Sequence, residues 1–134
     1  GTANSTVVIS DGEIASPVIE TPDVAVVLNQ PSLDRFEASM ARGGRIILNR
    51  SLIEAPVQRD DLEVTEVRAS EIAQDLGSAR AANMVAVGAF ARATALVEPE
   101  SLAEAIRFLF DRKGPKVVHL NLEAMEKGME AVEA

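Results

Sequence analysis

Two short runs of apolar residues place the tightest limit on how this chain can fold. Residues 24–28 read VAVVL and residues 46–48 read IIL, so neither run has a polar position that could face water. Runs of this kind are typical of strands in a parallel sheet that is covered on both faces. Pro31, just after the first run, suits the first turn of a helix because its missing N–H needs no partner there. We therefore expect a strand, a helix and a second, parallel strand between residues 24 and 48.

The helix that joins these strands is expected to carry Leu33, Phe36 and Met40 on one apolar face and to end at Gly43-Gly44. Further elements follow in the second half of the chain. They are a loop over residues 51–62, a half-exposed strand over 63–67, and helices over 69–76, 79–95, 101–110 and 122–132. The 79–95 helix is rich in Ala and Gly and nearly apolar all round, so it should be buried and closely packed. Ser101 and Glu104 match a capping box at the start of the next helix.

The first twenty residues predict an antiparallel hairpin. Residues 4–11 are rich in Thr, Val and Ile, Asp11-Gly12 is a strong turn signal, and residues 13–20 would form the returning strand. Pro17 would lie at an edge or a bulge, since it cannot donate a ladder hydrogen bond. The expected fold class is therefore α/β: a three-layer open sheet that is mostly parallel, with an antiparallel hairpin near the N-terminus and helices on both faces. A chain of 134 residues predicts one domain, over residues 1–134.

Composition argues against several classes of function. The net charge of −8 and the lack of a basic run disfavour a nucleic-acid partner or an anionic membrane, because both need clustered Lys and Arg. The sequence has no cysteine, so it forms no disulfide, thiolate metal site or cysteine-ligated iron–sulfur cluster. No apolar run reaches the ~18 residues of a membrane span, and no signal peptide is visible. We expect a cytoplasmic protein.

Polar side chains follow both predicted parallel strands. Asn29 and Gln30 come after the first strand, and Asn49 and Arg50 come after the second. The carboxyl ends of parallel strands meet at one edge of the sheet, where the ligands of open α/β sheets gather. Neutral amides donate and accept hydrogen bonds and cost less to desolvate than charges, so they suit a polar ligand or a subunit interface. The alternative is that they close turns. For Asn49 alone neither interpretation is favoured, whereas the repeated arrangement favours function.

Other candidate residues carry less information. Asn83 lies within the most apolar helix, where its amide would need a partner in a neighbouring loop or in another chain. The single histidine, His119, is more typical of a structural or solvated residue than of a catalytic one. The sequence has no GxGxxG, Walker loop or nucleophile elbow, and no carboxylate spacing typical of a metal site. We therefore expect no catalytic and no metal-binding residues in this chain.

Four pieces of the sequence, taken in order, resemble one protein family. They are GTANSTVVISDGEIASPVI, DVAVVLNQPSLDRF, GGRIILNRSLI and ARAANMVAVGAF, and the likeness as a whole runs from Gly1 to about Leu109. The chain resembles the gamma-type subunit of 2-oxoacid:ferredoxin oxidoreductases, most of all the 2-oxoglutarate/2-oxoacid group. The resemblance implies a non-catalytic gamma subunit that helps enclose the active centre of a complex. Such a complex would oxidatively decarboxylate a 2-oxoacid, such as 2-oxoglutarate or pyruvate, to an acyl-CoA.

The resemblance also implies cofactors and partners. Thiamine-binding alpha and beta subunits and a ferredoxin-like subunit would hold thiamine diphosphate and the iron–sulfur clusters. Coenzyme A would take the acyl group, and ferredoxin would accept the electrons. The isolated chain is expected to bind none of these cofactors and to be inactive. In this family a strand, a Gly-rich loop and a helix normally precede the GTAN stretch. The sequence does not contain them, so no residue can be assigned to a phosphate contact from that loop.

The strand ends and the resemblance together give the candidate site. The residues expected to face the active centre or a subunit interface are Gly1, Thr2, Asn4, Asn29, Gln30, Asn49, Arg50 and Asn83. Two other functions remain open at this point: a free-standing flavodoxin-like nucleotide-binding module, and a scaffold protein without oxoacid chemistry. Met125 and Met129 on the last helix are compatible with a homodimer of the isolated chain.

Overall fold

A parallel sheet forms the centre of the molecule. The computed structural model describes residues 4–15 and 19–133. Among these residues three strands pair in the order β1-β2-β3, namely β1 (Val24–Val27), β2 (Arg45–Asn49) and β3 (Glu63–Val67). Both pairings are parallel, with Val27 opposite Leu48 and Asn49 opposite Val67. The two apolar runs are therefore neighbouring parallel strands, as the sequence predicts.

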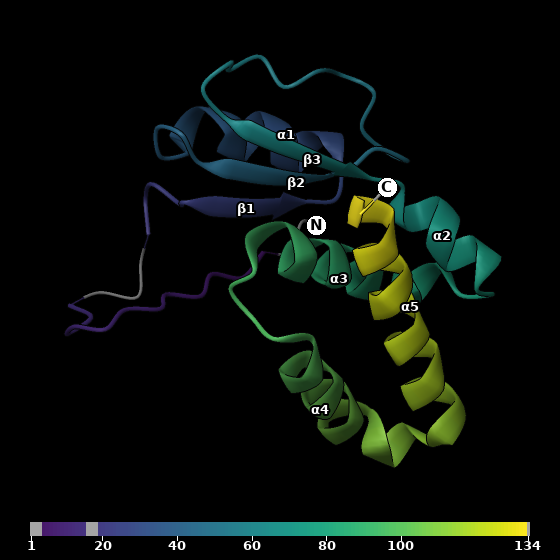
Figure 1. Ribbon diagram of the computed structural model, residues 1–134. Coiled ribbons are helices and arrows are strands. Elements are labelled where there is room, and N and C mark those ends of the chain that lie inside the picture. The colour runs from purple at the N-terminus through teal and green to yellow at the C-terminus, as the bar shows by residue number, and fades with distance from the viewer. Residues whose placement is uncertain (1–3, 16–18, 134) are drawn as a thin grey trace.

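Helices cover both faces of this sheet. The described helices are α1 (Gln30–Phe36), α2 (Ala69–Asp75), α3 (Ala82–Thr94), α4 (Pro99–Phe110) and α5 (Pro115–Glu133), with single 3₁₀ turns η1 (Glu37–Ser39), η2 (Ala79–Ala81) and η3 (Asp111–Lys113). Figure 1 shows α1 on one side of the sheet and α3 and α5 on the other, which confirms the expected α/β class. In the part of the chain that is described, none of these helices is long and apolar enough to cross a membrane.

The alternation of side chains along β2 divides the core into two halves. Ile46 and Leu48 point to the α1 side, where they pack with Leu33 and Met40. Ile47 points to the opposite side and packs with small residues of α2, α3 and α5. All three strand residues have an exposed fraction of 0%. Burial of both faces explains why the run contains no polar position.

Helices α3 and α5 pack at unusually close range. A Cβ added to Gly88 of α3 would overlap the backbone carbonyl of Met125, and a Cβ added to Gly128 of α5 would overlap the backbone carbonyl of Val85. Both glycines are buried, as is Ala89 beside them. The expectation that the Ala- and Gly-rich helix is buried and closely packed is confirmed.

The expected N-terminal hairpin is wrong. Residues 4–15 and 19–23 contain no strand, while Pro17 lies outside the described residues. Val7 and Ile9 are 79% and 78% exposed. A strand forms only when a neighbouring strand accepts and donates its backbone hydrogen bonds, and β2 is the described partner of β1. Strong β propensity in this segment is therefore not enough to form a hairpin.

Several helix boundaries also differ from the prediction, among them the start of the last helix, which is Pro115 rather than residue 122. The expected capping box at Ser101 is wrong, because α4 begins two residues earlier at Pro99, with Glu98 as N-cap and no side-chain capping hydrogen bond. Proline is pre-organised for the first helical turn, so it starts the helix before the serine can cap it. Helix α1 ends at Phe36, short of Gly43, and η1 continues the chain to Ser39.

Candidate functional site

Asn49 connects three elements at the carboxyl edge of the sheet. Its side chain is buried, with 2% of the residue exposed. Nδ2 donates to the Leu28 carbonyl at 3.1 Å and to Ser70 Oγ at 3.0 Å. Oδ1 accepts from the backbone N–H of Ser51 at 3.3 Å and of Ser70 at 3.4 Å. The amide thus links the end of β1, the loop after β2 and the first turn of α2.

Asn29 and Gln30 lie at the same edge, at the start of α1. Asn29 is exposed and is the N-cap of the helix, where its Oδ1 accepts a hydrogen bond from the Ser32 backbone at 3.0 Å. Gln30 donates from Nε2 to Asp34 Oδ1 at 2.8 Å. Because β1 and β2 are parallel, the carboxyl-terminal positions of both strands fall on one side of the sheet. The amide at Asn29 therefore acts locally as a cap, with its side chain still open to solvent.

Arg50 fixes the loop that follows β2. Its Nη1 donates to the carbonyls of Ile53 at 2.9 Å and Ala55 at 3.1 Å, and its Nη2 pairs with Glu66 of β3. Arg50 also lines a shallow pocket of ≈ 450 Å³ at the carboxyl end of the sheet. The other residues that line the pocket are Glu66, Val67, Arg68, Glu71, Ile72, Asp75 and Ala131. The pocket therefore mixes two guanidinium groups with three carboxylates.

The remaining predicted site residues are dispersed. Gly1 and Thr2 lie outside the described residues, and Asn4 is exposed. Asn83 lies in the first turn of α3 and is exposed, so its contact with another chain stays a prediction. His119 is also on the surface, with a side chain 79% exposed and Nε2 3.7 Å from Glu123 of the same helix. The sheet edge thus brings together Asn29, Gln30, Asn49 and Arg50.

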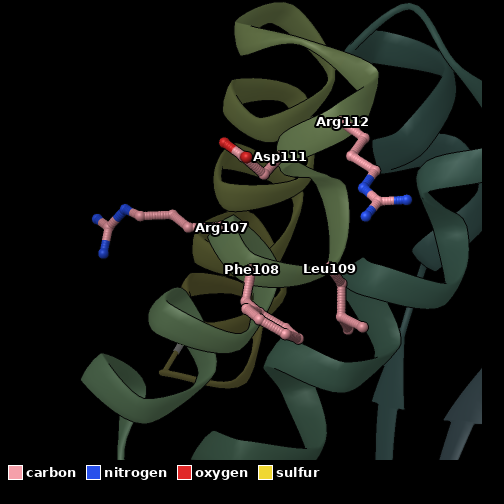
Figure 2. Close-up of a pocket in the computed structure, with 5 residues that line it drawn as sticks. All are labelled: Arg107, Phe108, Leu109, Asp111 and Arg112. Atoms are coloured by element: carbon pink, nitrogen blue, oxygen red, sulfur yellow. The ribbon is translucent and has the colours of Figure 1, made fainter.

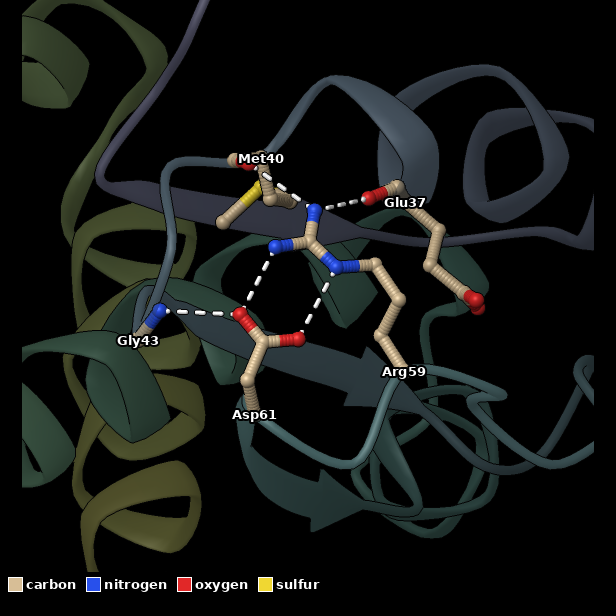
Figure 3. A network of polar contacts seen from close by, with 5 residues as sticks. All are labelled: Glu37, Met40, Gly43, Arg59 and Asp61. Carbon is tan, nitrogen blue, oxygen red and sulfur yellow. Dashed lines mark hydrogen bonds and ion pairs between the residues drawn. The ribbon is translucent and has the colours of Figure 1, made fainter.

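A second polar cluster, at the opposite edge of the sheet, was not predicted from the sequence (Figure 3). Arg59 Nη1 donates to the carbonyls of Glu37 at 3.0 Å and Met40 at 2.9 Å. The same guanidinium binds Asp61 through Nε at 3.0 Å and Nη2 at 2.7 Å. Asp61 in turn accepts from the Gly43 N–H at 3.0 Å. We call this cluster the Arg59–Asp61 clamp, because it fastens the loop before β3 to the turn before β2.

The clamp shifts the ionisation of both partners. The hydrogen bond from Arg59 lowers the pKa of Asp61 to about 2, and the Gly43 N–H adds to this effect. The hydrogen bond to Asp61 raises the pKa of Arg59 above its usual value. Both partners are therefore charged at neutral pH, as expected for an ion pair with two aligned hydrogen bonds. The described residues contain no group of three His, Cys, Asp or Glu side chains that could hold a metal ion.

Comparison with known proteins decides the family. The model of the family described as pyruvate ferredoxin/flavodoxin oxidoreductase matches residues 1–131. The chain belongs to this family. The resemblance predicted from the four sequence pieces is therefore confirmed.

Relatives of the pyruvate ferredoxin/flavodoxin oxidoreductase family differ in length. Ketoisovalerate oxidoreductase subunit VorA of Methanothermobacter thermautotrophicus is 41% identical over 131 residues, which are 97% of this chain and 27% of VorA. The 2-oxoglutarate synthase subunit KorC of the same organism is 30% identical over 138 residues, covering 98% of this chain and 71% of KorC. The chain thus spans about a quarter of one relative and most of the other.

A solved member of the family has the same fold. The gamma subunit of a keto/oxoacid ferredoxin oxidoreductase from Geobacter sulfurreducens superposes with a TM-score of 0.72 and is 25% identical. The matched region covers 83% of this chain and 64% of the Geobacter chain. The three-layer arrangement around the parallel sheet is therefore shared with a gamma subunit of this family.

Proposed function

We propose that the chain is the gamma-type part of a 2-oxoacid:ferredoxin oxidoreductase that oxidatively decarboxylates a 2-oxoacid to an acyl-CoA. The observation that carries the proposal is the family match over residues 1–131, which spans almost the whole sequence. The identity with VorA and KorC and the similarity to a gamma subunit support the same role. Fold alone would not suffice, since the same architecture serves many functions.

The proposed role of this chain is to build a wall of the active centre without supplying reacting groups. The Asn49 amide donates and accepts hydrogen bonds within the chain. The Arg50 guanidinium donates to two loop carbonyls and pairs with Glu66. Groups engaged in this way stabilise the edge and hold its shape. The exposed amide of Asn29 and the neighbouring Gln30 form the part of the edge that we propose to face the active centre.

The cofactors of such an enzyme fit other parts of the assembly better than this chain. Residues 1–134 contain no cysteine, so a cysteine-ligated iron–sulfur cluster requires ligands from elsewhere. We propose that thiamine-binding alpha and beta portions and a ferredoxin-like portion hold thiamine diphosphate and the clusters, with coenzyme A and ferredoxin as acceptors.

The substrate is proposed to be a branched-chain 2-oxoacid. Identity is 41% with the subunit named for ketoisovalerate and 30% with the subunit named for 2-oxoglutarate. This difference favours ketoisovalerate over 2-oxoglutarate. The whole assembly, co-expressed from neighbouring genes, should form a stable complex and reduce ferredoxin with the highest kcat/KM for ketoisovalerate. A complex that forms but turns over no 2-oxoacid would refute the proposed function.

Substitution of the exposed amides tests the wall. In the assembled enzyme, Asn29→Ser keeps a capping oxygen while removing the amide, and Gln30→Ala removes the second one. The double variant should assemble normally and lose about tenfold in kcat/KM, which corresponds to about 1.4 kcal/mol of transition-state stabilisation. The matched control is Asp34→Ala, which removes the partner of Gln30 but neither amide. Equal activity of the double variant and the control would show that the edge does not face the active centre.

A further inference from the structure

Helix α4 stands apart from the three layers of the fold. Figure 1 shows it as an arm below the sheet, joined to the body through α5. Its inner side is anchored by Ile106, which is 2% exposed, and its main neighbours are α5 and η3. The outer side is apolar as well: Phe108 is 84% exposed and Leu109 is 67% exposed. The apolar surface of this helix is therefore wider than the part that its own chain covers.

The exposed apolar residues form one surface with arginine side chains beside it. Phe108 and Leu109 extend to the same side in Figure 2 and line a shallow pocket of ≈ 570 Å³ together with Arg107, Asp111 and Arg112. Ala105, one helical turn before Leu109, is exposed too. We call Ala105, Arg107, Phe108, Leu109 and Arg112 the α4 patch.

The charge around the α4 patch is opposite to that of the molecule. Residues 104–116 carry four of the 13 Lys and Arg residues and two of the 21 Asp and Glu residues, in a chain of net charge −8. Lys113 lies 6.0 Å from the centre of the Phe110 ring, which keeps one of these cations at the same end of the helix. A cationic, apolar surface on an acidic chain favours an acidic partner, because complementary charge steers association and like charge opposes it.

We propose that the α4 patch docks on a companion subunit of the oxidoreductase, at an apolar socket bordered by carboxylates. This inference rests on the proposed function. An exposed Phe flanked by Arg is typical of the residues that dominate protein interfaces. The matched region forms 27% of the longer VorA chain, so the family joins this fold to neighbours of different sequence. That relationship favours a companion subunit over a second copy as the occupant.

The test measures assembly of the complete complex. The chain is co-expressed with the companion subunits, and binding is followed by titration of the purified chain into the complex that lacks it. Phe108→Ser with Leu109→Ser should raise the Kd at least tenfold, because two central apolar contacts are lost. Arg107→Glu with Arg112→Glu should also raise the Kd and should weaken its dependence on salt. Circular dichroism of each variant checks that the helices are retained.

Two matched controls separate the patch from general surface effects. Val64→Ser changes a valine of β3 that is 39% exposed and lies away from both the α4 patch and the carboxyl edge of the sheet. Arg35→Glu with Arg42→Glu reverses two exposed arginines around α1, on the opposite face of the sheet. Both controls should bind the companion subunits like the wild type.

Several outcomes would overturn the inference. One is unchanged affinity of both α4 variants for the companion subunits. Another is that the isolated wild-type chain is a dimer, the Phe108→Ser, Leu109→Ser variant is a monomer, and both bind the companion subunits equally. A second copy of the chain would then cover the patch. A third is that the wild-type chain binds anionic vesicles and the α4 variants do not, while both bind the companion subunits equally. This result would assign the patch to a membrane. Failure of the wild-type chain to join any complex would instead refute the proposed function.

Discussion

At the scale of single residues, the side-chain amides at the strand ends have different tasks. Asn49 is buried and uses both halves of its amide within the chain, whereas Asn29 is exposed and caps a helix. Both were predicted to lie at one edge, and both do. The sequence could not separate the two tasks, because burial depends on how α2 and the loop after β2 pack over the strand end.

The buried amide should contribute measurably to stability. Asn49→Ala removes hydrogen bonds to Leu28 and Ser70 and leaves those groups without their partner. We expect a loss of about 1–3 kcal/mol in the free energy of unfolding, measured by urea denaturation. The exposed Asn83→Ala is the matched control and should change stability by less than about 0.5 kcal/mol. Equal effects of the two substitutions would contradict the role assigned to Asn49.

The Arg59–Asp61 clamp should make stability depend on pH in acid. The pKa of Asp61 falls from its ordinary value of 3.8 to about 2 in the folded chain. A lowered pKa in the folded state means that the stabilisation is fully present above pH 3.8 and is lost as the pH falls towards about 2. Asp61→Asn should therefore be less stable than the wild type at pH 7, and the difference should shrink over this acid range.

Denaturation at a series of pH values measures this difference. Asp60→Asn, which removes the adjacent carboxylate and leaves the clamp intact, is the control and should retain the acid-dependent loss. A constant difference between Asp61→Asn and the wild type from pH 7 to pH 2 would contradict the prediction.

At the scale of elements, the parallel pair and most helices could be predicted because their signals are local. The apolar run Ile46, Ile47 and Leu48 predicts a strand covered on both faces, and α2 ends close to the predicted residue 76. The N-terminal hairpin failed because the sequence reports β propensity and turn residues but not a pairing partner. The clamp was missed for a similar reason, since Arg59 and Met40 are far apart in the sequence.

The contact between α3 and α5 should tolerate no added side chain. Gly88→Ala or Gly128→Ala would place a methyl group against a backbone carbonyl of the other helix. Backbone atoms cannot move aside as a flexible side chain can, so we expect a loss of about 1–3 kcal/mol or more in the free energy of unfolding. Gly12→Ala is the matched control, because its Cβ would lie 3.8 Å from Ser10 Oγ, an ordinary contact. Thermal denaturation of the three variants distinguishes these outcomes, and equal midpoints would contradict close packing.

At the scale of the whole molecule, two surfaces lie at opposite ends of α5. The helix has 19 residues and is therefore about 28 Å long. Ala131 near its end lines the pocket at the carboxyl edge of the sheet, and Pro115 at its start follows the arm formed by α4 and η3. Packing against α3 fixes the position of this helix, and so fixes the distance between the proposed active-centre wall and the α4 patch.

At the two facing glycines, Gly88 and Gly128, the contact between α3 and α5 is made by main-chain atoms of the opposite helix. Substitutions of the surrounding side chains can therefore accumulate while the spacing between the two surfaces stays constant. A relative whose core has diverged widely should still present both surfaces at the same separation, as long as both glycines remain. Conversely, a change at Gly88 alone would displace one surface relative to the other, and assembly would fail at a site that the substituted residue never touches.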